Sequence, residues 1–189
     1  MSAQTRIRLP SIATSAHARG AALVVGLLIL LVITIIGLSS MRSTLLEERM
    51  AGNLRDRARA FEAAEAALRA AEGWLLSQGS RPLTNSGSPY EVWTANGPDP
   101  DTSNATPWWF ENTIDAAWWS SNARSHSYYL LPSTPGYVVE EMQFVPDSGT
   151  LNIGTGTTTG RWFYRITARA TGADSATEVL LQSTYAVRF

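Results

Sequence analysis

The hydrophobic pattern of the chain begins with one long apolar run. No residue between Arg19 and Arg42 is charged, and AALVVGLLILLVITIIGL makes up most of this stretch. As a helix it covers roughly 33 Å, which matches a bilayer core of about 30 Å. Residues 1–20 carry arginines and no acid, so the positive-inside rule places them in the cytoplasm. The pattern predicts one membrane span over residues 21–41, with the rest of the chain on the far side.

Residues 42–76 change to an amphipathic helical pattern. The stretch is rich in Ala, Leu, Glu and Arg and contains no proline. Apolar side chains recur at steps of three or four, as on one helix face. The members of this face are Leu54, Ala58, Phe61, Ala64, Leu68, Ala71 and Leu75. No stop signal precedes them, although Gly37 and Gly52 weaken a helix locally. We predict one continuous helix over about residues 21–76.

The remaining segment, residues 77–189, is long enough to bury a core of its own. Its first part is dense in Gly, Pro, Ser, Asn and Thr and predicts irregular loops. Alternating apolar positions predict strands over 136–145, 161–170 and 178–187, with a Gly/Thr loop over 147–160. An antiparallel sheet of at least three strands needs a cover for its apolar face, and the amphipathic helix supplies one. The predicted fold class is α+β.

Four of the seven tryptophans are concentrated in WWFENTIDAAWWS, residues 108–120. Thr106 is a candidate N-cap and Pro107 suits a first helical position, so a short amphipathic helix is expected here. Its apolar stripe would consist of Phe110, Ile114, Ala117 and Trp118. The indole rings either pack in the core, contact a partner protein or stack on a sugar. The candidates for a partner contact are Trp108, Trp109 and Trp119.

Composition excludes much chemistry. The net charge of −1 gives no electrostatic case for nucleic-acid binding. With no cysteine, the chain has no disulfides, thiolate metal sites or cysteine nucleophiles. His126 lies between two serines, but no G-x-S-x-G motif supports a hydrolase. Residues 99–104 offer oxygen ligands without the acid and glycine of a calcium loop. We expect no catalytic residue, no metal and no cofactor.

The order of the segments resembles that of a type IV prepilin: a basic leader ending in glycine, an apolar helix, an amphipathic extension and a body. The stretches RGAALVVGLLILLVITIIGLSSM and ERMAGNLRDRARAFEAAEAALRAAE resemble the N-terminal region of the PilX family of minor pilins. Two further stretches, YVVEEM and YRITARATGADSATEVLLQSTY, resemble the C-terminal region of that family. The resemblance covers about half of the chain and leaves residues 77–136 unmatched.

This resemblance implies that residues 1–20 are a leader peptide. Prepilin peptidase would cut between Gly20 and Ala21 and methylate the new amine of Ala21. The mature chain would have a transmembrane half-helix (21–41), an amphipathic half-helix (42–76) and a periplasmic pilin domain (77–189). It would sit in the inner membrane as a single-pass protein and then at the pilus tip on the cell surface.

The resemblance also implies a function and partners. A minor pilin of this kind primes pilus assembly and sits in the tip complex without catalysing a reaction. The implied partners are other minor pilins, the major pilin, a large tip adhesin, prepilin peptidase and the inner-membrane assembly platform. Contacts within the helix bundle are expected at Val25, Leu27, Leu30, Leu31 and Thr34.

One departure from the pilin pattern bears on the position in the filament. Most pilins carry glutamate as the fifth mature residue, where it pairs with the terminal amine of a neighbouring subunit; here that residue is Val25. A carboxylate in lipid needs such a positive partner, so a subunit without it lacks one subunit-to-subunit bond. In the related secretion system, the pseudopilin without this glutamate occupies the filament tip. By analogy, Val25 indicates a tip or priming position.

Other interpretations of the N-terminus stay open at this point. A minor pseudopilin of a type II secretion system has the same kind of N-terminus. A signal-anchored periplasmic binding module would retain residues 1–20 and stay monomeric. A cleaved signal peptide fits less well, because the apolar run exceeds its usual length of roughly 7–15 residues.

Overall fold

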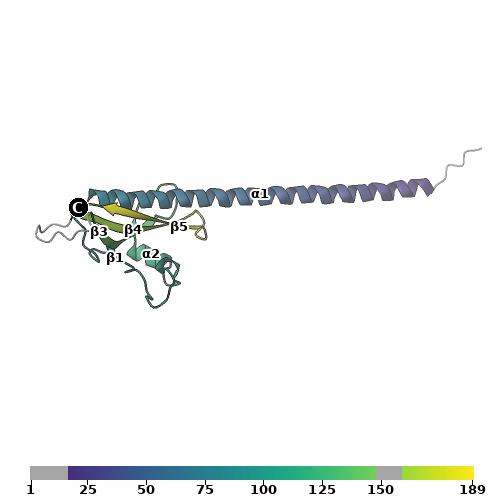
Figure 1. The fold of residues 1–189 in the computed structure, drawn as a ribbon. Helices are drawn as coiled ribbons and strands as arrows, with labels where there is room; N and C mark the ends of the chain where they lie inside the picture. The colour runs from purple at the N-terminus through teal and green to yellow at the C-terminus, as the bar shows by residue number, and fades with distance from the viewer. Residues whose placement is uncertain (1–16, 148–158) are drawn as a thin grey trace, which may run out of the picture. The chain divides into compact units, whose positions relative to one another are not determined.

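The computed structural model describes residues 17–147 and 159–189. It contains two structural units, one ending at Ala51 and the other comprising Gly52–Phe189. Helix α1 (His17–Ser77) is continuous, so the predicted helix over 21–76 is confirmed and neither Gly37 nor Gly52 interrupts it (Figure 1). Most of the expected leader and of the expected loop over 147–160 lies outside the described residues.

The described part of the first unit is α1 up to Ala51, and it includes the apolar run of that helix. By length and composition, this helix can cross a membrane, and the described residues contain one such helix. None of its most apolar window is buried within the chain. Leucine, valine and isoleucine side chains therefore cover its whole circumference, which is the pattern of a helix that faces lipid or other helices.

The second unit is built on a five-stranded sheet. Its long strands are β3 (Gly136–Pro146), β4 (Gly160–Thr171) and β5 (Glu178–Val187), which pair antiparallel in that order. They confirm the three strands predicted from sequence. Two short strands, β1 (Trp93–Thr94, parallel) and β2 (Arg124–Ser125, antiparallel), pair with β3 and were not predicted.

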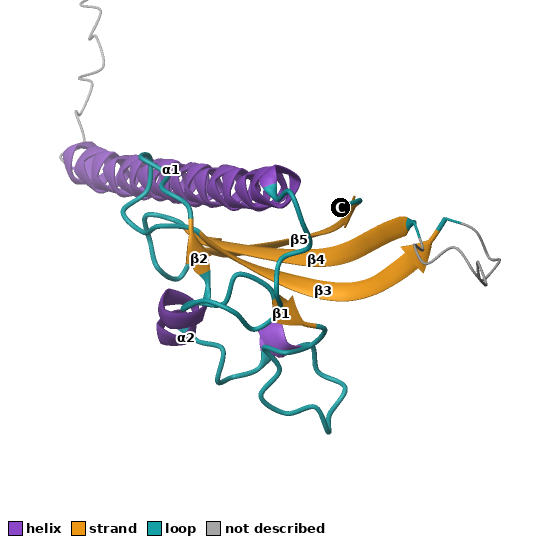
Figure 2. Cartoon of the chain, turned by 90° about the vertical axis from the view of Figure 1, so that its left-hand side faces the viewer, coloured by secondary structure: helices purple, strands orange, loops and turns teal. Residues whose placement is uncertain are grey.

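One face of the sheet packs against the C-terminal part of α1 (Figure 2). The α1 residues buried there are Ala60, Ala63, Ala64, Ala67, Ala71 and Leu75. Ala67, Ala71 and Leu75 share a cluster with Tyr164 and Ile166 of β4. Because most of these helix side chains are alanines, the helix backbone can lie close to the strands. The predicted α+β class, with a long helix on the sheet, is confirmed.

The predicted apolar face of α1 was wrong in its first half. Leu54 and Phe61 are 69% and 47% exposed, and Ala58 is exposed as well. Burial starts only at Ala60, where α1 meets the sheet, and the buried face is then set by small side chains. A hydrophobicity pattern weights leucine and phenylalanine above alanine, so it assigned the face to the larger residues.

The tryptophan-rich segment forms two short helices instead of the single predicted one. These are the 3₁₀ helix η1 (Trp108–Phe110) and α2 (Ala116–Asn122). Asp115, and not Thr106, is the N-cap that matters, because its carboxylate accepts the Trp118 N–H at 2.8 Å. The extended backbone of Glu111 ends η1 and separates the two helices. Phe110 of the predicted stripe is therefore 68% exposed.

This segment covers the second face of the sheet, opposite α1 (Figure 2). Trp108, Ile114, Trp119 and Ala123 form one cluster with Val138 of β3. The second unit is thus a three-layer arrangement, with α1 on one face of the sheet and the tryptophan-rich segment on the other. Successive residues of β3 and β4 point to opposite faces of the sheet, so they pack alternately against α1 and against the tryptophan-rich segment.

Asp56 of α1 holds the turn between β4 and β5. Its Oδ1 accepts the N–H of Ala173 at 2.6 Å and its Oδ2 that of Asp174 at 3.4 Å. Gly172 leaves room for the carboxylate, since a Cβ there would lie 2.2 Å from Oδ2. The hydrogen bond from the Ala173 N–H, followed by one from the Thr177 side chain, lowers the pKa of Asp56 below its ordinary value of 3.8.

We therefore expect Asp56→Asn to lower the free energy of unfolding at neutral pH. A carboxyl group whose pKa is lower in the folded state stabilises fully above its ordinary pKa and loses this contribution as the pH falls through the folded pKa. The difference between wild type and Asp56→Asn should be constant from about pH 7 to pH 5 and shrink below about pH 4. Denaturant unfolding of the full chain in detergent measures it. A difference that grows on acidification would contradict the assignment.

Candidate functional site

The helix surface of the first unit carries the predicted assembly contacts. Val25, Leu27, Leu30 and Leu31 are 55–67% exposed, and Thr34 is exposed too. Leu27, Leu30, Leu31 and Thr34 follow steps of three or four and lie on one helix face, whereas Val25 lies on roughly the opposite side. The Thr34 hydroxyl donates to the Leu30 carbonyl within the helix, so it leaves no donor unpaired in lipid.

The predicted processing site lies near the start of α1. Gly20 and Ala21 are exposed, and a Cβ at Gly20 would meet no heavy atom within 4 Å. No described part of the chain therefore covers the bond between them. Processing at this bond stays a prediction.

The three predicted tryptophan contacts differ in their exposure. Trp108 and Trp119 are 1% and 6% exposed, so both rings belong to the core of the sheet's second face. Trp109 is half-buried, and the guanidinium of Arg165 lies 5.1 Å from its ring centroid. Burial supports the core alternative for the first two residues. Among the three, Trp109 presents the most surface for a partner contact.

Sequence reasoning missed the polar centre of the body, an ion pair between Glu140 of β3 and Arg165 of β4. The two residues are direct register partners. The Glu140 side chain is fully buried and that of Arg165 is 17% exposed. The guanidinium donates from Nε to Oε2 at 2.9 Å and from Nη2 to Oε1 at 2.6 Å. The one sign of this ion pair in the sequence was that each of the two charged residues lies in the middle of a predicted strand.

The Glu140 carboxylate also connects the tryptophan-rich layer to the sheet by hydrogen bonds. The Trp108 indole N–H donates to Oε2 of Glu140 at 3.1 Å, and the Asn96 N–H donates to Oε1 at 3.1 Å. Arg165 Nη2 also donates to the Asn96 side-chain oxygen at 2.6 Å. One buried acid thus connects two strands with two points of the long connection between α1 and β2. Its role in this structure is to organise the body, since both oxygens are engaged.

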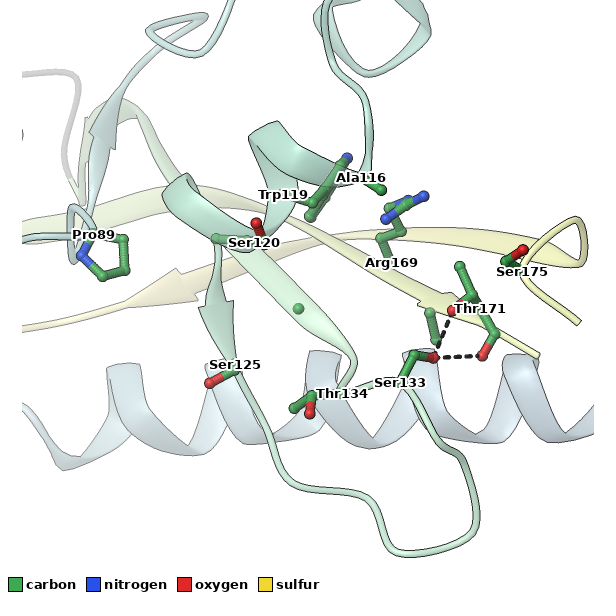
Figure 3. A pocket seen from close by; sticks show the side chains of 13 residues that line it. Pro89, Ala116, Trp119, Ser120, Ser125, Ser133, Thr134, Arg169, Thr171 and Ser175 are labelled. Atoms are coloured by element: carbon green, nitrogen blue, oxygen red, sulfur yellow. Dashed lines mark hydrogen bonds between the residues drawn. The ribbon is translucent and has the colours of Figure 1, made fainter. Parts of the chain in front are cut away.

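A second feature of this layer is an open cleft of about 630 Å³ between α2 and the end of β4 (Figure 3). Hydroxyl groups line it, from Ser120, Ser125, Ser133, Thr134, Thr171 and Ser175. Arg169 is the charged residue of its described lining, and Glu178 Oε2 accepts from Arg169 Nη2 at 2.8 Å. Ser133 donates to the Thr171 carbonyl at 3.2 Å. The cleft therefore mixes hydroxyl groups with a larger share of apolar lining, and Glu178 compensates the charge of Arg169.

The described residues contain no cluster of three or more His, Cys, Asp or Glu side chains that could hold a metal ion. Asp99 and Asp101 instead accept backbone N–H groups two residues further along, from Asp101 and Ser103. These are turn-forming bonds of the kind expected for aspartate in loops.

Comparison with protein families covers nearly the whole described chain. Residues 19–69 match the PilX N-terminal family, and residues 72–187 match the type IV pilus assembly protein PilX C-terminal family. The chain belongs to the PilX family. This PilX-family pilin is a minor pilin of type IV pilus assembly, and the match includes residues 77–136, which no sequence motif had assigned. No curated protein and no solved structure is similar enough to count as a match.

PilX membership accounts for the architecture of the molecule. The apolar half of α1 fits membrane anchoring, and the family places the body in the periplasm or the pilus. It also implies a structural subunit that interacts with other type IV pilus components.

Proposed function

We propose that this PilX-family pilin primes pilus assembly and stays in the tip complex as a non-catalytic subunit. The observation that carries the proposal is Val25, an exposed apolar residue where most pilins have a glutamate. Without that carboxylate, the subunit lacks one bond to a neighbouring protomer. A position with a missing neighbour, at the end of the filament, tolerates this loss best.

The proposed mechanism is an exchange of environments by one helix. The exposed apolar side chains around residues 21–41 contact lipid before assembly. In the filament they contact the helices of other pilins, where close packing replaces the lipid contacts. Transfer of this helix from the membrane into the filament buries no charged side chain, because no charged residue lies between Arg19 and Arg42. The body carried by α1 remains on the surface of the assembly.

Processing precedes this exchange. We propose that prepilin peptidase removes residues 1–20 and methylates Ala21, which leaves the segments 21–41, 42–76 and 77–189. The mature chain then joins other minor pilins, the major pilin and a large tip adhesin on the inner-membrane platform. The C-terminal family model names type IV pilus assembly, which supports a pilus over a secretion system as its setting.

We expect the protein from its native membrane to begin with N-methylated Ala21, lacking Arg6, Arg8 and Arg19. Intact mass and fragmentation of the N-terminus check this result. An intact leader would support the signal-anchored module instead. Quantitative mass spectrometry of isolated filaments should detect the chain at far fewer copies than the major pilin, and its complete absence from filaments would refute the proposed function.

A further inference from the structure

Strand β5 is the outer strand of the sheet, on the side away from β1 and β2. The order β1–β3–β4–β5 gives β5 one neighbour, and its second edge pairs with no strand in residues 17–147 and 159–189. The register with β4 runs without a shift from Trp162↔Val187 to Thr171↔Glu178. Figure 2 shows β5 at this edge, beside β4. An edge of this kind presents backbone donors and acceptors to other chains.

The phase of the β4–β5 ladder identifies the backbone groups on the free edge. The Gly172 N–H donates to the Thr177 carbonyl at 2.8 Å, one step beyond the last register pair. Hydrogen-bonded and non-hydrogen-bonded pairs alternate in an antiparallel ladder. The odd-numbered residues of β5 therefore bond to β4, and the even-numbered residues point their N–H and C=O groups outward. The outward residues are Glu178, Leu180, Gln182, Thr184 and Ala186.

The two edges of the sheet are protected to different degrees. On the β3 edge, β1 and β2 pair with the strand, a register shift falls between Glu141 and Gln143, and Pro146 ends the strand. Bulges and prolines are features that prevent further pairing. Strand β5 has a regular register and contains no proline, and none of its residues after Glu178 is charged. Its edge therefore lacks the usual protection against strand addition.

We propose that the free edge of β5 is a docking edge for an extended segment of a different protein in the pilus tip. The segment pairs with the five outward residues and adds a sixth strand to the sheet. Backbone hydrogen bonds supply the attraction, and the neighbouring side chains select the segment. Since Leu180, Gln182 and Thr184 are uncharged, the matching segment is uncharged in its centre and rich in β-branched or aromatic residues. This inference rests on the proposed function.

A second copy of the chain fits the edge less well. Two β5 strands that pair across a two-fold axis run antiparallel in one continuous sheet. That axis is normal to the sheet, so it reverses every direction parallel to the sheet plane. Helix α1 packs on the sheet face, so the two copies of its C-terminal part would run in opposite directions. Bodies related by such a two-fold axis point in opposite directions, whereas the subunits of one filament all enter it in the same direction, as the proposed function requires. A segment of a different protein has no such constraint.

Thr184 offers the sharpest test. Its side chain is exposed, and its N–H points away from β4. Thr184→Pro removes this N–H without removing a donor from the β4–β5 ladder. Thr184→Ala retains the N–H and is the matched control. With each variant as the sole copy in cells, we expect equal amounts in the membrane but about tenfold less Thr184→Pro in isolated filaments. Equal amounts of the two variants in filaments would overturn the docking edge.

Hydrogen–deuterium exchange tests the unaltered full chain, where no substitution can disturb folding. We compare the chain purified in detergent with the chain in isolated filaments, at single-residue resolution. The amides of Leu180, Gln182, Thr184 and Ala186 should exchange about tenfold more slowly in filaments, whereas those of Leu181 and Ser183 should be slow in both. Fast exchange of the even-numbered amides in both samples would overturn the proposal.

Two further outcomes separate this proposal from the proposed function. If the wild-type chain is missing from filaments, the proposed function fails. If the wild-type chain is present and both Thr184 variants enter filaments equally, only the docking edge fails. Thr184→Cys gives the cysteine-free chain a single thiol. A disulfide between two Thr184→Cys chains in filaments would identify a second copy as the occupant and overturn the proposal as stated.

Discussion

Replacing Glu140 by glutamine is expected to lower the free energy of unfolding of the body by about 3–5 kcal/mol. The wild-type carboxylate is fully buried and accepts four hydrogen bonds, two from Arg165 and one each from Trp108 and Asn96. Glutamine has no negative charge to balance Arg165. Its side-chain NH2 group also faces N–H donors at a position where the wild-type carboxylate oxygen accepts hydrogen bonds. The guanidinium, 17% exposed, is then left mostly buried without a counter-charge, which costs more than the pair itself contributes.

Asp147→Asn is the matched control. Asp147 pairs with Arg188 at 2.9 Å, but the two side chains are 35% and 54% exposed, so its loss should cost less than about 1 kcal/mol. Denaturant unfolding of the full chain in detergent, followed by tryptophan fluorescence, compares the two variants. If Glu140→Gln costs no more than Asp147→Asn, the buried pair does not organise the body. The double variant Glu140→Leu with Arg165→Met should recover part of the loss, because it removes both charges.

The sequence patterns were sufficient for the helix and the long strands because each carries a long periodic signal. Alternation along β4 assigned Tyr164, Ile166 and Ala168 to one face, and the structure buries all three against α1. Strand β5 followed in the same way through Val179 and Val187. The residues of β1 and β2 escaped prediction because two-residue strands have no period, and their pairing with β3 is decided by tertiary contacts.

The structure of the tryptophan-rich segment could not be predicted because contacts between residues far apart in the chain determine it. The sequence suggested one helix from Pro107, whereas the capping bond of Asp115 and the hydrogen bond from Trp108 to Glu140 produce two shorter ones. Glu140 contacts residues 25 to 44 positions away in the chain, which no periodicity analysis detects. Trp108 is fixed by this contact and by burial, and it therefore serves the core more than a partner.

The assembly contacts on the apolar helix stay a prediction, and the structure shows only where these residues lie on the helix. Every residue proposed on the apolar helix is exposed within the chain, as a bundle contact requires. Helical geometry divides the set, however, because Leu27, Leu30, Leu31 and Thr34 share a face that Val25 does not. The open edge of β5 was not visible in the sequence, since strand order decides which strand has a single neighbour.

If the proposed position at the filament end is correct, Val25→Glu should let the subunit occupy the filament body as well, with about tenfold more copies per filament. The new carboxylate can pair with the terminal amine of an adjacent pilin. A tenfold change in copy number corresponds to a free-energy difference of roughly 1.4 kcal/mol between the filament end and the filament body, and one such charge-assisted bond exceeds this difference. Residue 25 is close to the start of the apolar run, so an acid there costs less than the roughly 2.5–3.5 kcal/mol of a charge at the helix centre. Quantitative mass spectrometry of isolated filaments, normalised to the major pilin, measures the copy number.

Val24→Glu is the control that isolates position from charge. Val24 is 61% exposed, close to the 56% of Val25, but its side chain lies about 100° away around the helix. A glutamate at position 24 has the same cost of placing a charge in the membrane but does not reach the terminal amine of the neighbouring pilin. The copy number of Val24→Glu in filaments should therefore fall below that of the wild-type chain. If both variants reach the membrane and Val25→Glu enters filaments no more often than Val24→Glu, the missing carboxylate does not set the position of this pilin. The tip assignment would then have to rest on the body alone, because Val25 is the feature of the anchor helix that supports it.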